Sequence, residues 1–156
     1  MQEKIKICFV CHGNICRSPM AEFVFKKLVK ERGVEDKFEI CSRATSSEEI
    51  YRGVGNPIYP PARLEMKRRG VPFDESKRAQ RLERDEYDKY DLFVCMDLNN
   101  IRNANLILPK PDKTKLLLDY TSRGGSVADP WYTDRFDIAF NDIYEGSVAL
   151  LNHLTK

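Results

Sequence analysis

The sequence lacks several features that would point to common classes of protein. No apolar run approaches the length needed to cross a bilayer, so we expect no membrane insertion. Only two histidines occur, His12 and His153, remote from each other, and no paired-cysteine spacing typical of zinc is present. No Gly-Lys-Ser/Thr follows a glycine-rich segment, which excludes a Walker phosphate loop. We therefore predict neither a metal nor a cofactor.

The sequence also lacks a large excess of positive or negative charge. The chain has 26 Lys and Arg against 24 Asp and Glu, a formal net charge of +2. Such a balance gives no reason to expect nucleic acid as a partner.

Cysteine is the residue that stands out among those present. The five cysteines are an odd number and form no compact secreted framework; they are Cys8, Cys11, Cys16, Cys41 and Cys95. The first residues alternate polar and apolar before a continuous apolar run, as a strand does, rather than forming a signal peptide. We therefore expect a reducing, cytoplasmic location, where a cysteine in a loop is a candidate for reactivity.

The length and hydrophobic pattern predict one α/β domain covering residues 1–156. The chain has 156 residues, of which 42% are hydrophobic. Strands are expected at 5–10, 38–42, 92–96 and 116–118, helices at 17–32, 62–69, 98–108 and 135–154, and loops at 44–61 and 122–134. Strands that alternate with helices indicate a three-layer, doubly wound sandwich around a four-stranded parallel sheet. Ligands bind such sheets at the carboxyl ends of the strands, so the loops after the first and fourth strands are expected to converge.

The loop between the first strand and the first helix is the most informative segment. It consists of Cys11, His12, Gly13, Asn14, Ile15, Cys16, Arg17 and Ser18. Unpaired backbone N–H groups and the positive end of the helix dipole meet in such a turn, which favours phosphate and other oxyanions. Gly13 and Asn14 are the residues best suited to the left-handed conformations that turn N–H groups inward.

Within that loop, Cys11 and Arg17 suggest phosphoryl chemistry. The N–H groups that favour a phosphate also favour a thiolate at Cys11. The planar fork of Arg17, which five residues separate from Cys11, can hold two phosphate oxygens. Ser18 can donate a hydrogen bond to the thiolate. Taken alone, Cys11 would more often be a buried structural residue.

These residues closely resemble the signature of the low-molecular-weight protein tyrosine phosphatase family, bacterial type. That signature is Cys, five residues, Arg and Ser near the N-terminus, here residues 11–18 followed by Pro19. The family's second mark, an Asp-Pro pair followed by aromatics, is matched by Asp129-Pro130-Trp131-Tyr132. The resemblance covers essentially the whole chain and implies a phosphotyrosine-containing protein as substrate.

The resemblance also implies roles for residues. Cys11 attacks phosphorus and forms a phosphocysteine, Arg17 binds the equatorial oxygens, and Asp129 protonates the leaving phenol and then activates water. Further residues are implied in support: Asn14 and Ser42 hold the shape of the loop, Ser18 stabilises the thiolate, and Trp131 and Tyr132 wall the pocket.

The sequence departs from the family at two supporting positions. Many members carry an aromatic wall shortly after the position of Ser42, and Tyr51 is the candidate for it here. Many also place a His in the segment after Gly70 to support the loop asparagine; this chain has none there, so the support must come from elsewhere. Separately, Cys16 shares the tight loop with Cys11 and is the candidate partner for a reversible redox switch.

Three alternatives remain beside the phosphatase. Arsenate reductases use the same loop but need two further redox cysteines, and only Cys95 lies near the middle of the chain. Arginine phosphatases share the fold, but they carry a Thr at the position of Ile15. A phosphotyrosine-binding module without catalysis would not need to keep Cys11, Arg17 and Asp129 together.

Overall fold

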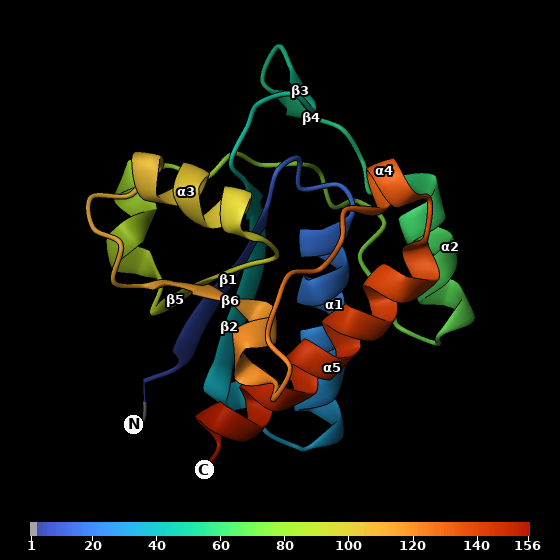
Figure 1. Cartoon of the computed structure of the whole chain (residues 1–156), viewed down its shortest axis with the longest axis vertical. Coiled ribbons are helices and arrows are strands. Elements are labelled where there is room, and N and C mark those ends of the chain that lie inside the picture. The colour runs from blue at the N-terminus through green and yellow to red at the C-terminus, as the bar shows by residue number, and fades with distance from the viewer. Residues whose placement is uncertain (1–2) are drawn as a thin grey trace.

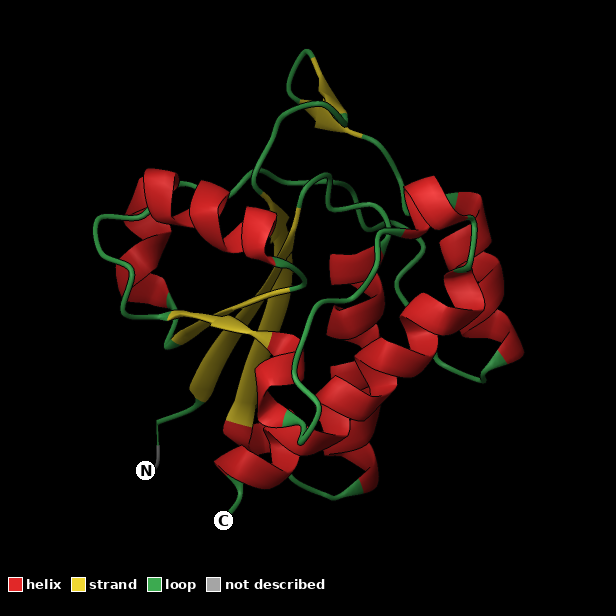
Figure 2. Cartoon of the chain, in the orientation of Figure 1, coloured by secondary structure: helices red, strands yellow, loops and turns green. Residues whose placement is uncertain are grey.

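The computed structural model describes residues 3–156, in which four parallel strands form the central sheet. The strand order is β2 (Phe38–Ala44), β1 (Ile5–Cys11), β5 (Leu92–Cys95) and β6 (Thr114–Leu116). Figure 2 shows this sheet between two groups of helices. At the carboxyl end of β1, Cys11 lies beside Ala44 of β2, and Val10 lies beside Cys95 of β5. The predicted four-stranded parallel α/β fold is confirmed.

The helices cover both faces of the sheet, as a doubly wound fold requires. On one face lie α1 (Arg17–Glu31) and α5 (Phe136–Leu154), which pack on each other, with α2 (Pro60–Arg68) at their side. On the other face lie α3 (Leu98–Ile107) and the 3-10 helix η2 (Arg84–Lys89). Figure 1 shows α3 and α5 on opposite sides of the sheet. The short 3-10 helix η1 (Glu35–Lys37) leads into β2.

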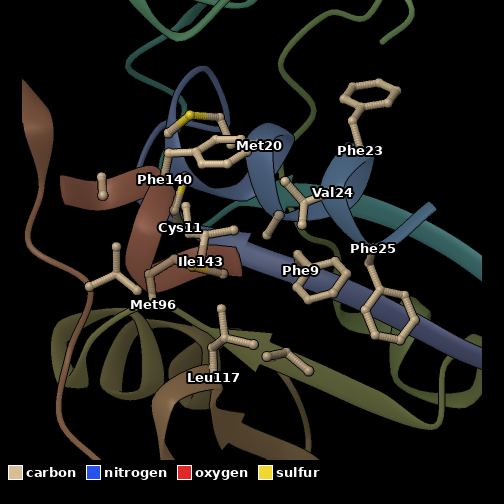
Figure 3. Close-up of a cluster of buried hydrophobic side chains, with 14 of the residues drawn as sticks. Phe9, Cys11, Met20, Phe23, Val24, Phe25, Met96, Leu117, Phe140 and Ile143 are labelled. Atoms are coloured by element: carbon tan, nitrogen blue, oxygen red, sulfur yellow. The ribbon is translucent and has the colours of Figure 1, made fainter. Parts of the chain in front are cut away.

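The larger core lies between the sheet and the α1/α5 layer. Phe9 of β1 and Phe25 of α1 are fully buried, with ring centroids 5.6 Å apart. Figure 3 shows this pair together with Leu117, Ile143 and the sulfur of Cys11 in the same cluster. A fully buried side chain of this size stabilises the fold by roughly 1.5–3 kcal/mol. The core thus fixes β1, whose last residue is Cys11.

Several local predictions were wrong. The predicted strand at 116–118 is instead β6 followed by the 3-10 helix η3 (Leu117–Tyr120), which packs against α5. The predicted loop 44–61 contains a small hairpin, β3 (Ile50–Tyr51) and β4 (Val54–Gly55). The loop 122–134 contains the four-residue helix α4 (Pro130–Thr133).

The hairpin and α4 lie at the carboxyl edge of the sheet. Figure 1 shows the loop after β1 at this edge, below the β3–β4 hairpin, with α4 to one side. The start of β1 and the end of α5 lie at the opposite edge. Within residues 3–156, no helix is long and apolar enough to cross a membrane.

Candidate active site

The loop after β1 wraps its backbone around the sulfur of Cys11. The Asn14 N–H donates to Cys11 Sγ at 3.3 Å, and Ser18 Oγ lies 3.0 Å from the same sulfur. Asn14 has a φ of 59°, the left-handed conformation that was predicted for it. Gly13 was expected to adopt this conformation too, but its φ is not positive. Gly13 is instead where the chain comes close to Glu49, because an added Cβ would lie 3.2 Å from Glu49 Cγ.

A buried polar network holds the loop from behind. The Asn14 side-chain amide donates to Ser18 Oγ at 2.8 Å and to Ser42 Oγ at 2.9 Å. Ser42 in turn donates to the carboxylate of Glu22, at 2.5 Å. All four side chains are buried, so each bond replaces one that water would otherwise make. The structure therefore brings together Asn14, Ser18 and Ser42, the residues predicted to support the loop, and adds Glu22.

The other end of the Asn14 amide is held by a lysine. Lys77 Nζ donates to Asn14 Oδ1 at 2.9 Å, and the backbone N–H of Gln80 donates to the same oxygen at 3.0 Å. The sequence has no histidine in the segment after Gly70, and the structure places this ammonium group on the asparagine. Burial lowers the pKa of Lys77, and the carboxylate of Glu22 opposes that shift.

Arg17 is locked in place beside the sulfur. Its Nη1 donates to Asp97 Oδ2 and to the carbonyl of Val127, both at 2.8 Å, and Nη2 lies 3.4 Å from Asp129 Oδ2. Burial works against the charged guanidinium, but the charges of Cys11 and of the two carboxylates outweigh it and raise the pKa of Arg17. The cation is therefore permanent, buried and oriented before any ligand binds.

Asp129 reaches the pocket from the start of α4. It is the N-cap residue of this helix, and its Oδ1 accepts a hydrogen bond from the Trp131 N–H at 3.0 Å. Pro130 follows at the first helical position, where its missing N–H is not needed. The Asp-Pro pair is thus a helix start that aims one carboxylate oxygen at Arg17 and leaves the side chain 27% exposed.

A pocket of about 130 Å³ joins these residues. It is lined by Cys11, His12, Gly13, Ile15, Cys16, Arg17, Glu48, Glu49, Asp129, Trp131 and Tyr132. Two loops far apart in sequence therefore meet at one site. The predicted wall residues Trp131 and Tyr132 line it, and Glu48 and Glu49 form a side that sequence reasoning missed. Glu48 lies 3.0 Å from His12 Nε2 at the rim.

Tyr51, the third predicted wall residue, does not line this pocket. Its side chain stands on β3 of the exposed hairpin, is 72% exposed, and stacks under the guanidinium of Arg52. Tyr59 provides an aromatic support instead, because its ring centroid lies 5.0 Å from that of Trp131. The prediction for Tyr51 is therefore corrected: the hairpin turns it outward, and the segment before α2 supports the wall.

Cys16 lies in the loop close to Cys11, and all five cysteines are free thiols. Burial, followed by the charge of Cys11, raises the pKa of Cys16. Cys95 is enclosed in β5, and burial raises its pKa too. In the described part of the chain, no group of three or more His, Cys, Asp or Glu side chains could hold a metal ion.

Asp97 and Lys77 are the important residues that sequence reasoning missed. Asp97 had a usable signal: it directly follows the strand predicted at 92–96, at the sheet edge where ligand sites form. In the structure it caps α3 through the Asn100 N–H at 2.8 Å. Lys77 had none. It lies in an irregular polar segment whose path depends on the tertiary fold.

Comparisons with known proteins agree with this geometry. Residues 6–156 match the sequence model of the family described as "Low molecular weight phosphotyrosine protein phosphatase". The enzyme of that name from Gallus gallus is 37% identical, over 91% of this chain and 88% of its own. The crystal structure of YfkJ from Bacillus subtilis superposes with a TM-score of 0.92 at 31% identity, covering 99% of this chain and 96% of that one. Wzb from Vibrio vulnificus, in complex with benzylphosphonate, gives a TM-score of 0.83 at 27% identity and covers 96% and 99% of the two chains.

Proposed function

The chain belongs to the low molecular weight phosphotyrosine protein phosphatase family, and from this premise we propose that Cys11, Arg17 and Asp129 hydrolyse phosphotyrosine in proteins through a phosphocysteine intermediate. The observation that carries the proposal is the single pocket in which the sulfur, the locked guanidinium and the carboxyl group of these three residues meet.

In the first step, the Cys11 thiolate attacks phosphorus. The S–P bond forms as the bond from phosphorus to the phenol oxygen breaks, and the Asp129 carboxylic acid gives its proton to that oxygen. The transition state spreads negative charge over three equatorial oxygens. Arg17 and the positive N-terminal end of α1 face that charge, and Asp97 holds the guanidinium in place.

In the second step, water removes the phosphoryl group from sulfur. The Asp129 carboxylate formed in the first step takes a proton from the attacking water, the S–P bond breaks, and Cys11 leaves as a thiolate. Inorganic phosphate departs and Asp129 is again protonated. The hydrogen bonds from Ser18 and Asn14 to the sulfur make it a better leaving group.

The pocket walls favour an aryl phosphate. Ile15, Trp131 and Tyr132 offer apolar faces on which a flat ring can pack. The structural relative Wzb was crystallised with benzylphosphonate, a phosphonate on an aromatic group. A phosphoserine side chain is too short to bring its phosphorus to the pocket floor past such walls. We therefore propose phosphotyrosine proteins as substrates, with phosphate and other oxyanions as ligands of the same loop.

The chemistry also bears on where the protein works. A thiolate nucleophile must stay reduced, and all five cysteines are free. We propose a reducing, cytoplasmic location and one domain over residues 1–156 that carries the whole reaction.

The test is Cys11→Ser assayed on a phosphotyrosine peptide. We expect turnover to fall to background while the peptide still binds, because the backbone donors and Arg17 remain and a serine hydroxyl supplies no comparable nucleophile. Binding is measured by calorimetry, with Cys95→Ser as the matched control, which should keep its turnover. Substantial turnover by a contaminant-free Cys11→Ser protein would overturn the assignment.

A further inference from the structure

We propose that Lys77 is a positioning residue that fixes the direction of the hydrogen bond between Ser18 and Cys11, and so helps to keep Cys11 a thiolate. The inference deepens the proposed function, because it rests on Cys11 as the nucleophile. It is carried by the chain of contacts from Lys77 through Asn14 and Ser18 to the sulfur.

Two donors fix the orientation of the Asn14 amide. An asparagine side chain has one end that accepts hydrogen bonds and one end that donates them. An ammonium group and a backbone N–H can only donate. Lys77 Nζ and the Gln80 N–H both approach the same atom of Asn14, at 2.9 and 3.0 Å, so that atom must be the oxygen. The amide nitrogen is therefore directed at Ser18 and Ser42.

The orientation of the Asn14 amide decides where the two serine hydroxyls donate. The Asn14 amide donates to both serine hydroxyls, so each serine must use its own hydrogen elsewhere. Ser42 directs its hydrogen to the carboxylate of Glu22, 2.5 Å away, which has no hydrogen to give when ionised. Ser18 has Cys11 Sγ at 3.0 Å and donates to it. A thiolate accepts such a bond far better than a thiol does.

Charged groups from two other elements surround Lys77. Glu22 and Lys26 of α1 and Cys41 and Arg43 of β2 line the same groove as Lys77. Asp74 and Arg78 of its own segment line the same shallow groove. Lys77 also donates to the carbonyls of Ser42 and Arg78. Its three hydrogens thus all have acceptors, and one of them is committed to Asn14.

The Gln80 N–H limits the size of the effect. This backbone donor stays in every side-chain variant and still favours the same amide orientation. Loss of Lys77 therefore weakens the network without abolishing it. Because this donor is retained, we expect roughly a threefold to tenfold loss of thiolate at pH values below the midpoint.

The experiment measures alkylation of Cys11 by iodoacetamide over a pH series, read by peptide mass spectrometry. In Lys77→Met, the midpoint of the rate–pH curve should move to higher pH, with a rate roughly threefold to tenfold lower below the midpoint and an unchanged plateau. Lys77→Arg keeps a charged donor and should keep the wild-type midpoint. Lys67→Met removes an exposed lysine paired with Glu75 and is the matched control.

A double-mutant cycle tests the route. In a Ser18→Ala background, Lys77→Met should cause no further shift, because the hydroxyl that relays the effect is gone. A wild-type midpoint in Lys77→Met, an equal shift in Lys67→Met or in Lys77→Arg, or an undiminished shift in the Ser18→Ala background would overturn the proposal. Turnover by Cys11→Ser tests the nucleophile separately, since alkylation reports the network whatever reaction Cys11 performs.

Discussion

Asp129 is held at two points before any proton transfer takes place. One carboxylate oxygen accepts from the Trp131 N–H, and the other lies 3.4 Å from Arg17 Nη2. The first contact alone is that of an ordinary helix cap, which an aspartate before a proline often provides. The second contact points the side chain into the pocket and makes the general-acid role testable against a merely structural one.

Asp129→Ala should reduce kcat/KM on a phosphotyrosine peptide by about 10²–10⁴-fold, the usual contribution of a general acid. On nitrophenyl phosphate the loss should be much smaller, because nitrophenolate leaves well without a proton. The comparison uses kcat/KM, which excludes the later hydrolysis of phosphocysteine.

The comparison of the two substrates provides the control. Equal losses of kcat/KM on both substrates would make Asp129 a helix cap only. Asp134 and Asp119 would then be tested next.

Cys16 is the candidate partner of Cys11 under oxidation. Peroxide would convert the Cys11 thiolate to a sulfenic acid, and the Cys16 thiol would then displace water to form a disulfide. Burial, and then the charge of Cys11, hold the pKa of Cys16 high. Once Cys11 is a neutral sulfenic acid, the second of these influences disappears and Cys16 loses its proton more readily.

Mild peroxide followed by peptide mapping checks this switch. We expect a Cys11–Cys16 crosslink that thiols reverse with recovery of activity. Cys16→Ser should instead give irreversible inactivation, whereas Cys95→Ser, in a buried strand, should behave like the wild type. Recovery of wild-type Cys11 as sulfinic or sulfonic acid without the crosslink would show that Cys16 only fills space.

The site residues that lie close together in the sequence could be predicted, whereas Lys77, which the tertiary fold brings in, could not. Asn14 and Ser18 lie in one loop, where the sequence itself indicates a cradle, and Ser42 followed from the resemblance. Lys77 lies 63 positions from Asn14, and its contact depends on how an irregular segment crosses the sheet edge. No local pattern encodes that path. Asp97 could have been predicted, because it directly follows the strand predicted at 92–96.

Among the elements, α4 joins the chemistry to the recognition of substrate. Its N-cap is Asp129, and its first turn carries Trp131 and Tyr132, both exposed on the pocket wall. A four-residue helix has little stability of its own. It is held by the contact of Trp131 with Tyr59, at 5.0 Å between centroids, and by the N-cap. Truncation of Trp131 should therefore weaken both the wall that contacts the substrate and the support of α4.

A panel of phosphopeptides should reveal strong preference for phosphotyrosine over phosphoserine and phosphothreonine. Trp131→Ala should lower kcat/KM for phosphotyrosine by roughly threefold to tenfold, as expected for the loss of aromatic contacts. Tyr144→Ala, which removes a part-exposed aromatic from α5 outside the pocket, is the matched control. Comparable efficiency on all three phosphopeptides would contradict the pocket assignment.

The wrong strand at 116–118 shows why some elements could not be predicted. Three consecutive leucines are compatible with either a buried strand or a buried turn of helix, and periodicity cannot separate the two over so short a run. The chain continues β6 only to Leu116, then turns so that Leu117 and Leu118 both face the core beside α5. The long periodic helices at 17–32 and 135–154, by contrast, were predicted to within a residue or so of α1 and α5.

At the scale of the whole molecule, the sheet places the reacting sulfur at the end of its best-protected strand. β1 is paired with β2 on one side and β5 on the other, and Ile7 to Val10 are fully buried. The β3–β4 hairpin, two residues in each strand, exposes Tyr51 and Val54 to solvent. Free energies of local opening follow such differences in burial and pairing.

Hydrogen–deuterium exchange should therefore be much slower in β1 than in the β3–β4 hairpin. Amides of β1 should exchange only with global unfolding, whereas those of the hairpin should exchange orders of magnitude faster. Mass spectrometry of peptides covering 5–11 and 48–56 measures both, and similar rates in the two would contradict this division. The consequence is kinetic: the hairpin that follows Glu48 and Glu49 of the pocket lining can open and re-form many times while the nucleophile stays undisturbed, so different protein surfaces can be accommodated beside the pocket without moving the atoms that react.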